Sequence, residues 1–228
     1  MTTEPRTAVV TGASSGIGAA VVRRLLTDDW HVVGISRRAA RFDHEGFTWL
    51  EADLDDFARL DRQARALGAV DAVVHAAGLQ HSAPLGDLDP DRGLRMWRVH
   101  VGAAEVLVNA LAPRLRDGAR VVLVGSRTMT GNPGKSQYVA TKSALTGMAR
   151  SWAAELVDRR ITVNVVAPGP TDTPMLADPG RAHTPPRLPP FGRFIEPDEV
   201  AGLVGFLLGP DGRNVTGQAI VQCAGTSL

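Results

Sequence analysis

Continuous apolar runs alternate with longer helical patterns, and this alternation constrains the fold more than any other feature of the sequence. The apolar runs cover residues 8–10, 32–35, 72–74, 121–124, 163–166 and 219–221. Runs without polar alternation are typical of strands buried on both faces of a parallel sheet. Helical patterns between them cover residues 16–27, 55–67, 89–111, 136–157 and 197–208. This order predicts an α/β protein with a doubly wound parallel sheet of about seven strands and helices on both faces.

The composition is that of an ordinary globular protein. Of 228 residues, 44% are hydrophobic and 21% are charged, so we expect one domain over residues 1–228 rather than a disordered chain. The formal net charge of +1 favours neither nucleic acid nor a membrane surface as a partner. With Cys223 as its one cysteine and no long apolar run, the chain predicts no disulfide, metal site or membrane span. Residues 1–6 do not resemble a signal peptide, so we expect a cytoplasmic protein.

One stretch, residues 171–194, interrupts the alternation. It contains six prolines and therefore predicts neither a regular helix nor a strand. It follows the apolar run 163–166, at the edge of the sheet where open α/β proteins bind their ligands. Long loops in such places are often functional, so we interpret this one as a substrate lid. A surface excursion or a subunit contact is the alternative.

A glycine-rich turn joins the first apolar run to the first helical pattern. Residues 11–18 read TGASSGIG. Gly12 permits a tight turn, Gly16 lets the backbone approach a pyrophosphate, and Gly18 lets the helix pack close to the sheet. The free N–H groups and the dipole at the helix N-terminus also favour phosphate. The turn predicts a dinucleotide cofactor, held by a segment that also includes Ser14, Ser15 and Ile17.

The end of the second apolar run indicates which dinucleotide binds. An acidic residue at this point would bond the ribose 2′-hydroxyl and repel a 2′-phosphate. The chain has Ser36, Arg37 and Arg38 instead. A hydroxyl and two guanidinium groups favour NADP(H) over NAD(H), unless both arginines are simply solvated surface charges.

A tyrosine and a lysine share one face of the helical pattern 136–157. Tyr138, the only tyrosine, and Lys142 are four residues apart. A nearby cation and an oxidised nicotinamide would lower the tyrosine pKa from its usual value of about 10. Such a hydroxyl can exchange a proton with a substrate during hydride transfer, and Ser126 offers a second hydroxyl to a carbonyl oxygen. The alternative is an exposed Tyr–Lys pair and a serine in a turn.

These residues together resemble the short-chain dehydrogenase/reductase family over residues 7–224. The turn is similar to the family's TGxxxGxG, and the stretch from Tyr138 to Lys142 is similar to its YxxxK. Ser126 is similar to the serine before the tyrosine, one residue closer than the commonest spacing. The resemblance implies a single-domain Rossmann fold.

The resemblance also implies further cofactor contacts. Asp53 matches the acidic residue that holds the adenine amine, and Thr173 matches the residue that contacts the nicotinamide carboxamide. The remaining positions implied along the cofactor are Leu54, Ala77, Gly78, Pro168, Gly169 and Thr171.

The chain departs from the family pattern in three places. The family's NNAG is His75-Ala76-Ala77-Gly78 here, and we interpret His75 as a packed residue that makes local hydrogen bonds. His100 stands where the family has an asparagine that anchors a proton-relaying water. A neutral imidazole could perform that relay or simply fill a polar niche in the core. The family's VDGG is also altered, and we expect Cys223 to be a small core residue.

The resemblance implies an NADPH-dependent reductase that converts a small-molecule ketone to a secondary alcohol. Tyr138 would donate the proton, Ser126 would bind the carbonyl oxygen, and Lys142 would hold the nicotinamide ribose. The alternatives are an NAD-dependent dehydrogenase of a cyclic alcohol or dihydrodiol, and a non-catalytic dinucleotide-binding redox sensor. Family members usually form homotetramers or homodimers, so we expect a homo-oligomer.

Overall fold

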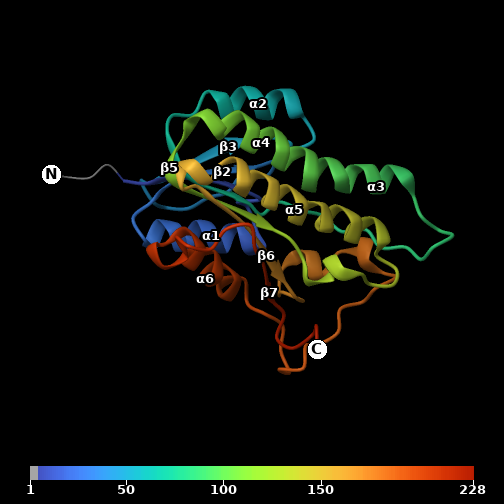
Figure 1. Ribbon diagram of the computed structural model, residues 1–228. Coiled ribbons are helices and arrows are strands. Elements are labelled where there is room, and N and C mark those ends of the chain that lie inside the picture. Colours follow the sequence, from blue (N-terminus) through green and yellow to red (C-terminus); the bar gives the residue numbers. More distant parts are fainter. Residues whose placement is uncertain (1–4) are drawn as a thin grey trace.

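A single seven-stranded sheet forms the centre of the molecule (Figure 1). The computed structural model describes residues 5–228. The strands are β1 (Thr7–Thr11), β2 (His31–Ser36), β3 (Phe47–Glu51), β4 (Val70–His75), β5 (Leu115–Val124), β6 (Thr162–Pro168) and β7 (Ala219–Gln222). Their order is β3-β2-β1-β4-β5-β6-β7, and all neighbouring pairs are parallel. The predicted doubly wound sheet of about seven strands is confirmed.

Helices cover both faces of the sheet (Figure 1). One face carries α1 (Gly16–Thr27) and α6 (Pro197–Leu208), whose ranges equal the predicted ones. The other face carries α2 (Phe57–Arg65), α4 (Ala103–Leu111) and α5 (Ser136–Glu155), with α3 (Pro90–Trp97) packed on α5. Each face buries its own hydrophobic cluster, so all strands except the edges are buried on both sides.

The strand β3 has no continuous apolar run in the sequence. It lies at the edge of the sheet, and its side chains are only partly buried. The connection from β2 to β3 contains no helix, as its length predicts. An edge strand needs no apolar run, which explains why six runs accompany seven strands.

The long helical pattern 89–111 is divided in the structure. α3 and α4 are separated by a π-helical turn, Arg98–Gly102. The turn inserts a residue into the helix, and such insertions often occur at functional sites. It places His100 and Val101 in the interior. The carbonyl of Val99, within the turn, lies 3.1 Å from Nε2 of His75.

Residues 171–194 form a loop that is closed at its base. The segment contains only two short 3₁₀ turns, Pro174–Ala177 and Pro179–Arg181. The N–H of Asp172 donates to the carbonyl of Ile195 at 2.8 Å, and the N–H of Ile195 donates to the carbonyl of Pro170 at 3.0 Å. These bonds bring the two ends of the loop together beside the end of β6.

Among residues 5–228, none of the helices combines the length and the apolar character needed to cross a lipid bilayer. Likewise, no group of three or more His, Cys, Asp and Glu side chains in this range could hold a metal ion.

Candidate active site

Two cavities meet at Gly78, at the carboxyl edge of the sheet. The first, which we call the reaction cavity, is lined by Ser126, Tyr138 and Lys142. It also contains Ile17, Gly78, Pro168, Gly169, Thr171 and Thr173. The second, which we call the adenosine cleft, is lined by Gly12, Ser14, Ser15, Ser36, Arg37, Arg38, Asp53, Leu54, Ala77 and Gly78. The fold therefore gathers most of the predicted site residues into one continuous groove.

At three glycines of the first turn, the backbone comes so close to a neighbouring segment that a side chain would not fit without a shift. Gly12 has a φ of +72°, and a Cβ there would lie 2.9 Å from the backbone of Ala77. A Cβ on Gly18 would lie 2.3 Å from the carbonyl oxygen of Gly12, so helix α1 packs directly on the turn. Gly16 has a φ of +55° and lies beside Thr173. The first turn and the segment after β6 therefore form facing walls of the groove.

The N-terminus of α1 fits a pyrophosphate. The side chain of Ser15, the N-cap residue, makes no capping hydrogen bond, and the first turn of α1 contains no acidic residue. The N–H groups that a helix leaves unpaired at this end are therefore free for an anion. This arrangement, together with the Gly12 approach, fits a dinucleotide.

The three residues after β2 take different positions in the adenosine cleft. The hydroxyl of Ser36 donates to the carbonyl of Arg38 at 2.7 Å and accepts from the indole of Trp49 at 3.2 Å, so it organises the turn. Arg37 lies 3.9 Å from a carboxylate oxygen of Asp53. Within residues 5–228, the guanidinium of Arg38 makes one hydrogen bond, to the neutral hydroxyl of Ser15 at 3.4 Å. The guanidinium of Arg38 is therefore the better placed of the two for a phosphate.

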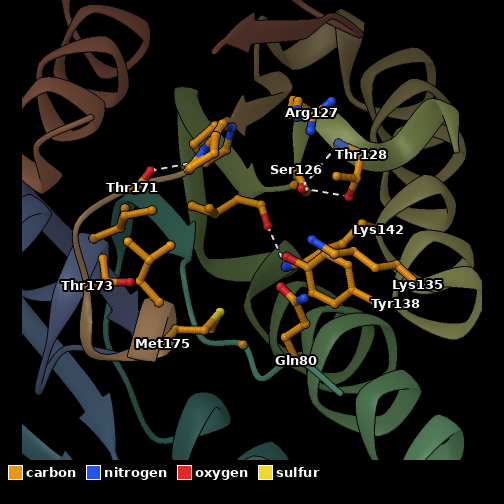
Figure 2. Close-up of a pocket in the computed structure, with 18 of the residues that line it drawn as sticks. Gln80, Ser126, Arg127, Thr128, Lys135, Tyr138, Lys142, Thr171, Thr173 and Met175 are labelled. Atoms are coloured by element: carbon orange, nitrogen blue, oxygen red, sulfur yellow. Dashed lines mark hydrogen bonds between the residues drawn. The ribbon is translucent and has the colours of Figure 1, made fainter. Parts of the chain in front are cut away.

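The catalytic candidates are positioned by β5 and α5. Tyr138 and Lys142 lie on the buried face of α5 (Figure 2). The amine of Lys142 donates to the carbonyl of Val124, the last residue of β5, at 2.8 Å. The hydroxyl of Ser126 lies 2.9 Å from the hydroxyl of Thr128, and Ser126 and Tyr138 line the same cavity. The alternative interpretation, an exposed Tyr–Lys pair, is excluded because both side chains are buried.

The pKa of Tyr138 moves in the opposite direction from the sequence prediction. Burial raises the pKa of the Tyr138 phenol, and the hydrogen bond from Ser126 only partly offsets this. Burial also lowers the pKa of Lys142 to about 7. The prediction considered the nearby cation but not the loss of water around the phenol. A phenol with a raised pKa is protonated at neutral pH and can act as a proton donor.

His100 is fully buried and uses both ring nitrogens. Its Nε2 accepts from the N–H of Leu79 at 3.0 Å. Its Nδ1 lies 2.8 Å from the hydroxyl of Thr141, which itself donates to the carbonyl of Tyr138. These bonds require a neutral ring with the proton on Nδ1. Burial lowers the pKa of His100 well below its usual value.

His75 is the second fully buried histidine. Its Nδ1 bonds the hydroxyl of Thr11 at 2.9 Å, and its Nε2 bonds the carbonyl of Val99 in the π-helical turn. The same Thr11 hydroxyl accepts from the N–H of Ala77 at 3.2 Å. Burial lowers the pKa of His75 to about 3. His75 therefore joins β1, β4 and the π-helical turn, in keeping with its predicted structural role.

The residues of the loop 171–194 that line the reaction cavity all come from the first half of the loop. Met175, Leu176 and Arg181 line the reaction cavity. Leu188 and Phe191, which an apolar wall could include, are 60% and 75% exposed and line none of the cavities described here.

Several residues that line the groove were not identified from the sequence. In the reaction cavity these include Arg127, Thr128 and Lys135, and in the adenosine cleft they include Arg95. None belongs to a short motif. Arg127 and Lys135 are adjacent or close in sequence to Ser126 and Tyr138, and that proximity was the only available signal.

Comparison with known proteins agrees with this architecture. A family model described as enoyl-(acyl carrier protein) reductase matches residues 12–227. The chain is 36% identical over 224 residues to the cyclic-di-GMP-binding biofilm dispersal mediator protein of Escherichia coli, with 93% of each chain covered. It is 33% identical to the 3-oxoacyl-(acyl-carrier-protein) reductase MabA of Mycobacterium tuberculosis, covering 98% of this chain and 93% of that protein.

A solved structure with the same fold was crystallised with a cofactor. It is a blue fluorescent protein from a metagenomic library in complex with NADPH, with a TM-score of 0.86, 32% identity and 98% of both chains covered. The chain belongs to the short-chain dehydrogenase/reductase family. It is an NAD(P)-dependent oxidoreductase that acts on CH–OH and C=O groups.

Proposed function

We propose that the protein uses NADPH to reduce a ketone to a secondary alcohol, with Tyr138 as the proton donor. The observation that carries this proposal is the placement of Ser126, Tyr138 and Lys142 in one cavity that meets the adenosine cleft at Gly78. When bound across the groove, the cofactor supplies the hydride. Ser126 and Tyr138 bind the carbonyl oxygen through their hydroxyl groups, where charge develops as the hydride arrives.

The protonation states support the reductive direction. Burial keeps the Tyr138 phenol protonated at neutral pH, so it has a proton to donate. The Lys142 amine, whose pKa burial lowers to about 7, binds the nicotinamide ribose and exchanges protons readily near neutral pH. The raised pKa of the phenol is less suited to alcohol oxidation by an NAD-dependent dehydrogenase, which requires the tyrosinate.

The preference for NADP(H) over NAD(H) rests on the charges of the adenosine cleft. Arg37, Arg38 and Arg95 line it, and the side chain of Arg95 makes no hydrogen bond or ion pair with the described residues. Asp53 is close to Arg37, so two guanidinium groups remain available for a 2′-phosphate. The NADPH complex of the metagenomic relative supports this preference.

Two further proposals concern the surroundings of the site. The first half of the loop 171–194 acts as the substrate lid, because it lines the reaction cavity. The protein also forms a homodimer or homotetramer in the cytoplasm. Leu94 and Trp97 of α3 are exposed apolar residues, whereas Leu107 and Leu145 are buried in the protomer's own core. Light scattering on the purified protein measures the oligomeric state.

Replacement of the tyrosine tests the proposed reaction. Tyr138→Phe removes the proton donor and should lower kcat for ketone reduction by about 10²- to 10⁴-fold. Fluorescence titration should give the same Kd for NADPH in both proteins. Turnover within a few-fold of wild type would overturn the assignment. A titration with cyclic di-GMP, the ligand in the name of the E. coli relative, tests whether the groove takes another dinucleotide.

A further inference from the structure

Three cationic side chains line the reaction cavity beside the reacting groups. Arg127 directly follows Ser126, Lys135 precedes α5, and Arg181 comes from the loop 171–194 (Figure 2 labels the first two). All three are partly buried. Among the described residues that line this cavity there is no aspartate or glutamate. The cavity lining therefore carries positive charge and no carboxylate, although the charge of Asp178, just outside the lining, also acts on Arg181.

The fold holds Arg181 over the cavity through its neighbour Gly180. The carbonyl of Gly180 accepts hydrogen bonds from the N–H and the hydroxyl of Ser82, at 2.8 and 3.2 Å. A Cβ on Gly180 would lie 2.7 Å from the carbonyl oxygen of Gln80, so only glycine allows this approach. On the other side, Thr184 contacts Gly134, next to Lys135. The position of Arg181 is thus fixed by packing on two separate loops.

The unpaired polar atoms of this cavity are donors. Nε of Arg181 and Nε2 of Gln80 are buried and have no hydrogen-bond partner in residues 5–228, and Gln80 is only 4% exposed. The amine of Lys135 also has no hydrogen-bond partner there. Unpaired buried donors are unfavourable unless a ligand satisfies them. The ligand that satisfies several donors and cations at once is an oxyanion.

The cationic side chains of the reaction cavity change the pKa values of Lys135 and Tyr138, as expected for neighbouring groups. Burial, together with the charges of Arg181 and Arg127, lowers the pKa of Lys135 to about 8. The charge of Arg181 also acts on Tyr138 and opposes the rise of its pKa. Because Arg181 and Tyr138 also line the same cavity, one small molecule can reach both side chains.

We propose that the substrate carries a carboxylate or phosphate group a few atoms from its carbonyl, and that Arg181, Lys135 and Gln80 bind this group. The inference rests on the proposed ketone reduction, because it assigns the other end of the same substrate. Arg181 and Lys135 determine specificity in this arrangement. The phenol of Tyr138 and the hydroxyl of Ser126 hold the carbonyl, while the cationic wall holds the anion.

Matched substrate pairs test the proposal. Each pair differs only in charge: 2-, 3- and 4-oxo acids with their methyl esters for the carboxylate, and dihydroxyacetone phosphate with dihydroxyacetone for the phosphate. NADPH consumption gives kcat/KM for each. We expect kcat/KM for the anion to exceed kcat/KM for its neutral partner by at least about 10-fold. This is the factor expected when a hydrogen bond to a charged group is lost. Equal or better use of every neutral partner would overturn the proposal.

Two variants and a control identify the residues. Arg181→Gln and Lys135→Gln should each bring the anion-to-neutral ratio of kcat/KM toward one, with an unchanged Kd for NADPH. Arg187→Gln, an exposed residue of the same loop that lines neither cavity, should keep the wild-type ratio. If the variants weaken NADPH binding and leave the ratio intact, the cations serve the cofactor and the proposal is wrong.

A binding measurement separates this proposal from the proposed reaction. Isothermal titration of the protein saturated with NADP⁺ is carried out with 3-oxobutanoate, inorganic phosphate and methyl 3-oxobutanoate. Binding of either anion that Arg181→Gln abolishes supports the anion site, even if no ketone is reduced and the proposed reaction fails. Reduction of neutral ketones without any binding of the anions supports the reaction and overturns the anion site.

Discussion

Nε2 of His100 accepts a hydrogen bond from the backbone N–H of Leu79 at 3.0 Å, and Nδ1 of the same ring bonds Thr141 on α5. The histidine thus connects the π-helical turn, the loop that contains Gly78 and the helix that contains Tyr138. Because both nitrogens are occupied and the ring is fully buried, we propose that His100 is a positioning residue rather than a proton relay.

The pH profile distinguishes positioning from proton relay. Burial lowers the pKa of His100 well below its usual value, so the ring is neutral at neutral pH. His100→Leu leaves the buried N–H of Leu79 unpaired, which should lower the free energy of unfolding by about 1–3 kcal/mol. The loop that contains Gly78 should shift as a result, and kcat should fall. The shape of the kcat–pH profile should not change, and His100→Asn should recover part of the rate. Loss of a limb between pH 6 and 9 in either variant would establish the relay instead.

His75 should make the protein less stable in mild acid. Its pKa is about 3 in the folded state, below the usual value of 6.5, so the unfolded chain binds more protons between these values. The free energy of unfolding therefore decreases as the pH falls through this window, by about 2 kcal/mol between pH 7 and 5 from this residue alone. His75→Asn should reduce that decrease in urea denaturation. His183→Asn, at an exposed position, should keep the wild-type dependence, and an unchanged dependence in His75→Asn would contradict the prediction.

Two glycine substitutions should have opposite effects on stability. Gly18→Ala places a Cβ 2.3 Å from the carbonyl oxygen of Gly12, and the resulting overpacking should cost about 1–3 kcal/mol. Gly147, in the middle of α5, has open space around it, so Gly147→Ala should stabilise the protein by about 0.5–1 kcal/mol. Thermal unfolding of both variants measures these changes. A Gly18→Ala protein as stable as wild type would show that the turn is looser than described.

The two arginines after β2 should contribute unequally to cofactor choice. The guanidinium of Arg37 forms an ion pair with Asp53, which partly neutralises it. The guanidinium of Arg38 has the neutral hydroxyl of Ser15 as its hydrogen-bond partner within residues 5–228. Arg38→Gln should weaken NADPH binding by about 10- to 100-fold, the range expected for a hydrogen bond to a charged group, and leave NADH binding unchanged. Arg37→Gln should have the smaller effect. Arg41→Gln, at an exposed position outside both cavities, is the control, and equal losses of NADPH and NADH affinity would refute a 2′-phosphate contact.

The sequence predicted the features that short segments determine. The ranges of α1 and α6 and the close packing at Gly18 follow from the local pattern of apolar residues and glycines. The joint position of Tyr138 and Lys142 follows from helical spacing. These features depend on neighbours within a few residues along the chain.

Features that depend on tertiary packing were not predictable in the same way. The π-helical turn in the pattern 89–111 depends on contacts with His75 and α5. The direction of the Tyr138 pKa shift depends on burial, which helical spacing does not reveal. Arg181 reaches the reaction cavity only because Gly180 packs on the loop after β4.

The backbone hydrogen bonds that join Asp172 and Ile195, and Ile195 and Pro170, close the loop 171–194 at its base. Because the loop leaves and rejoins the domain at one point, insertions, deletions and substitutions between these residues do not alter the register of β6 and β7. Such a segment can be exchanged among relatives as an interchangeable part. New substrates can then be acquired by changing some twenty residues while the folding of the rest of the chain is preserved.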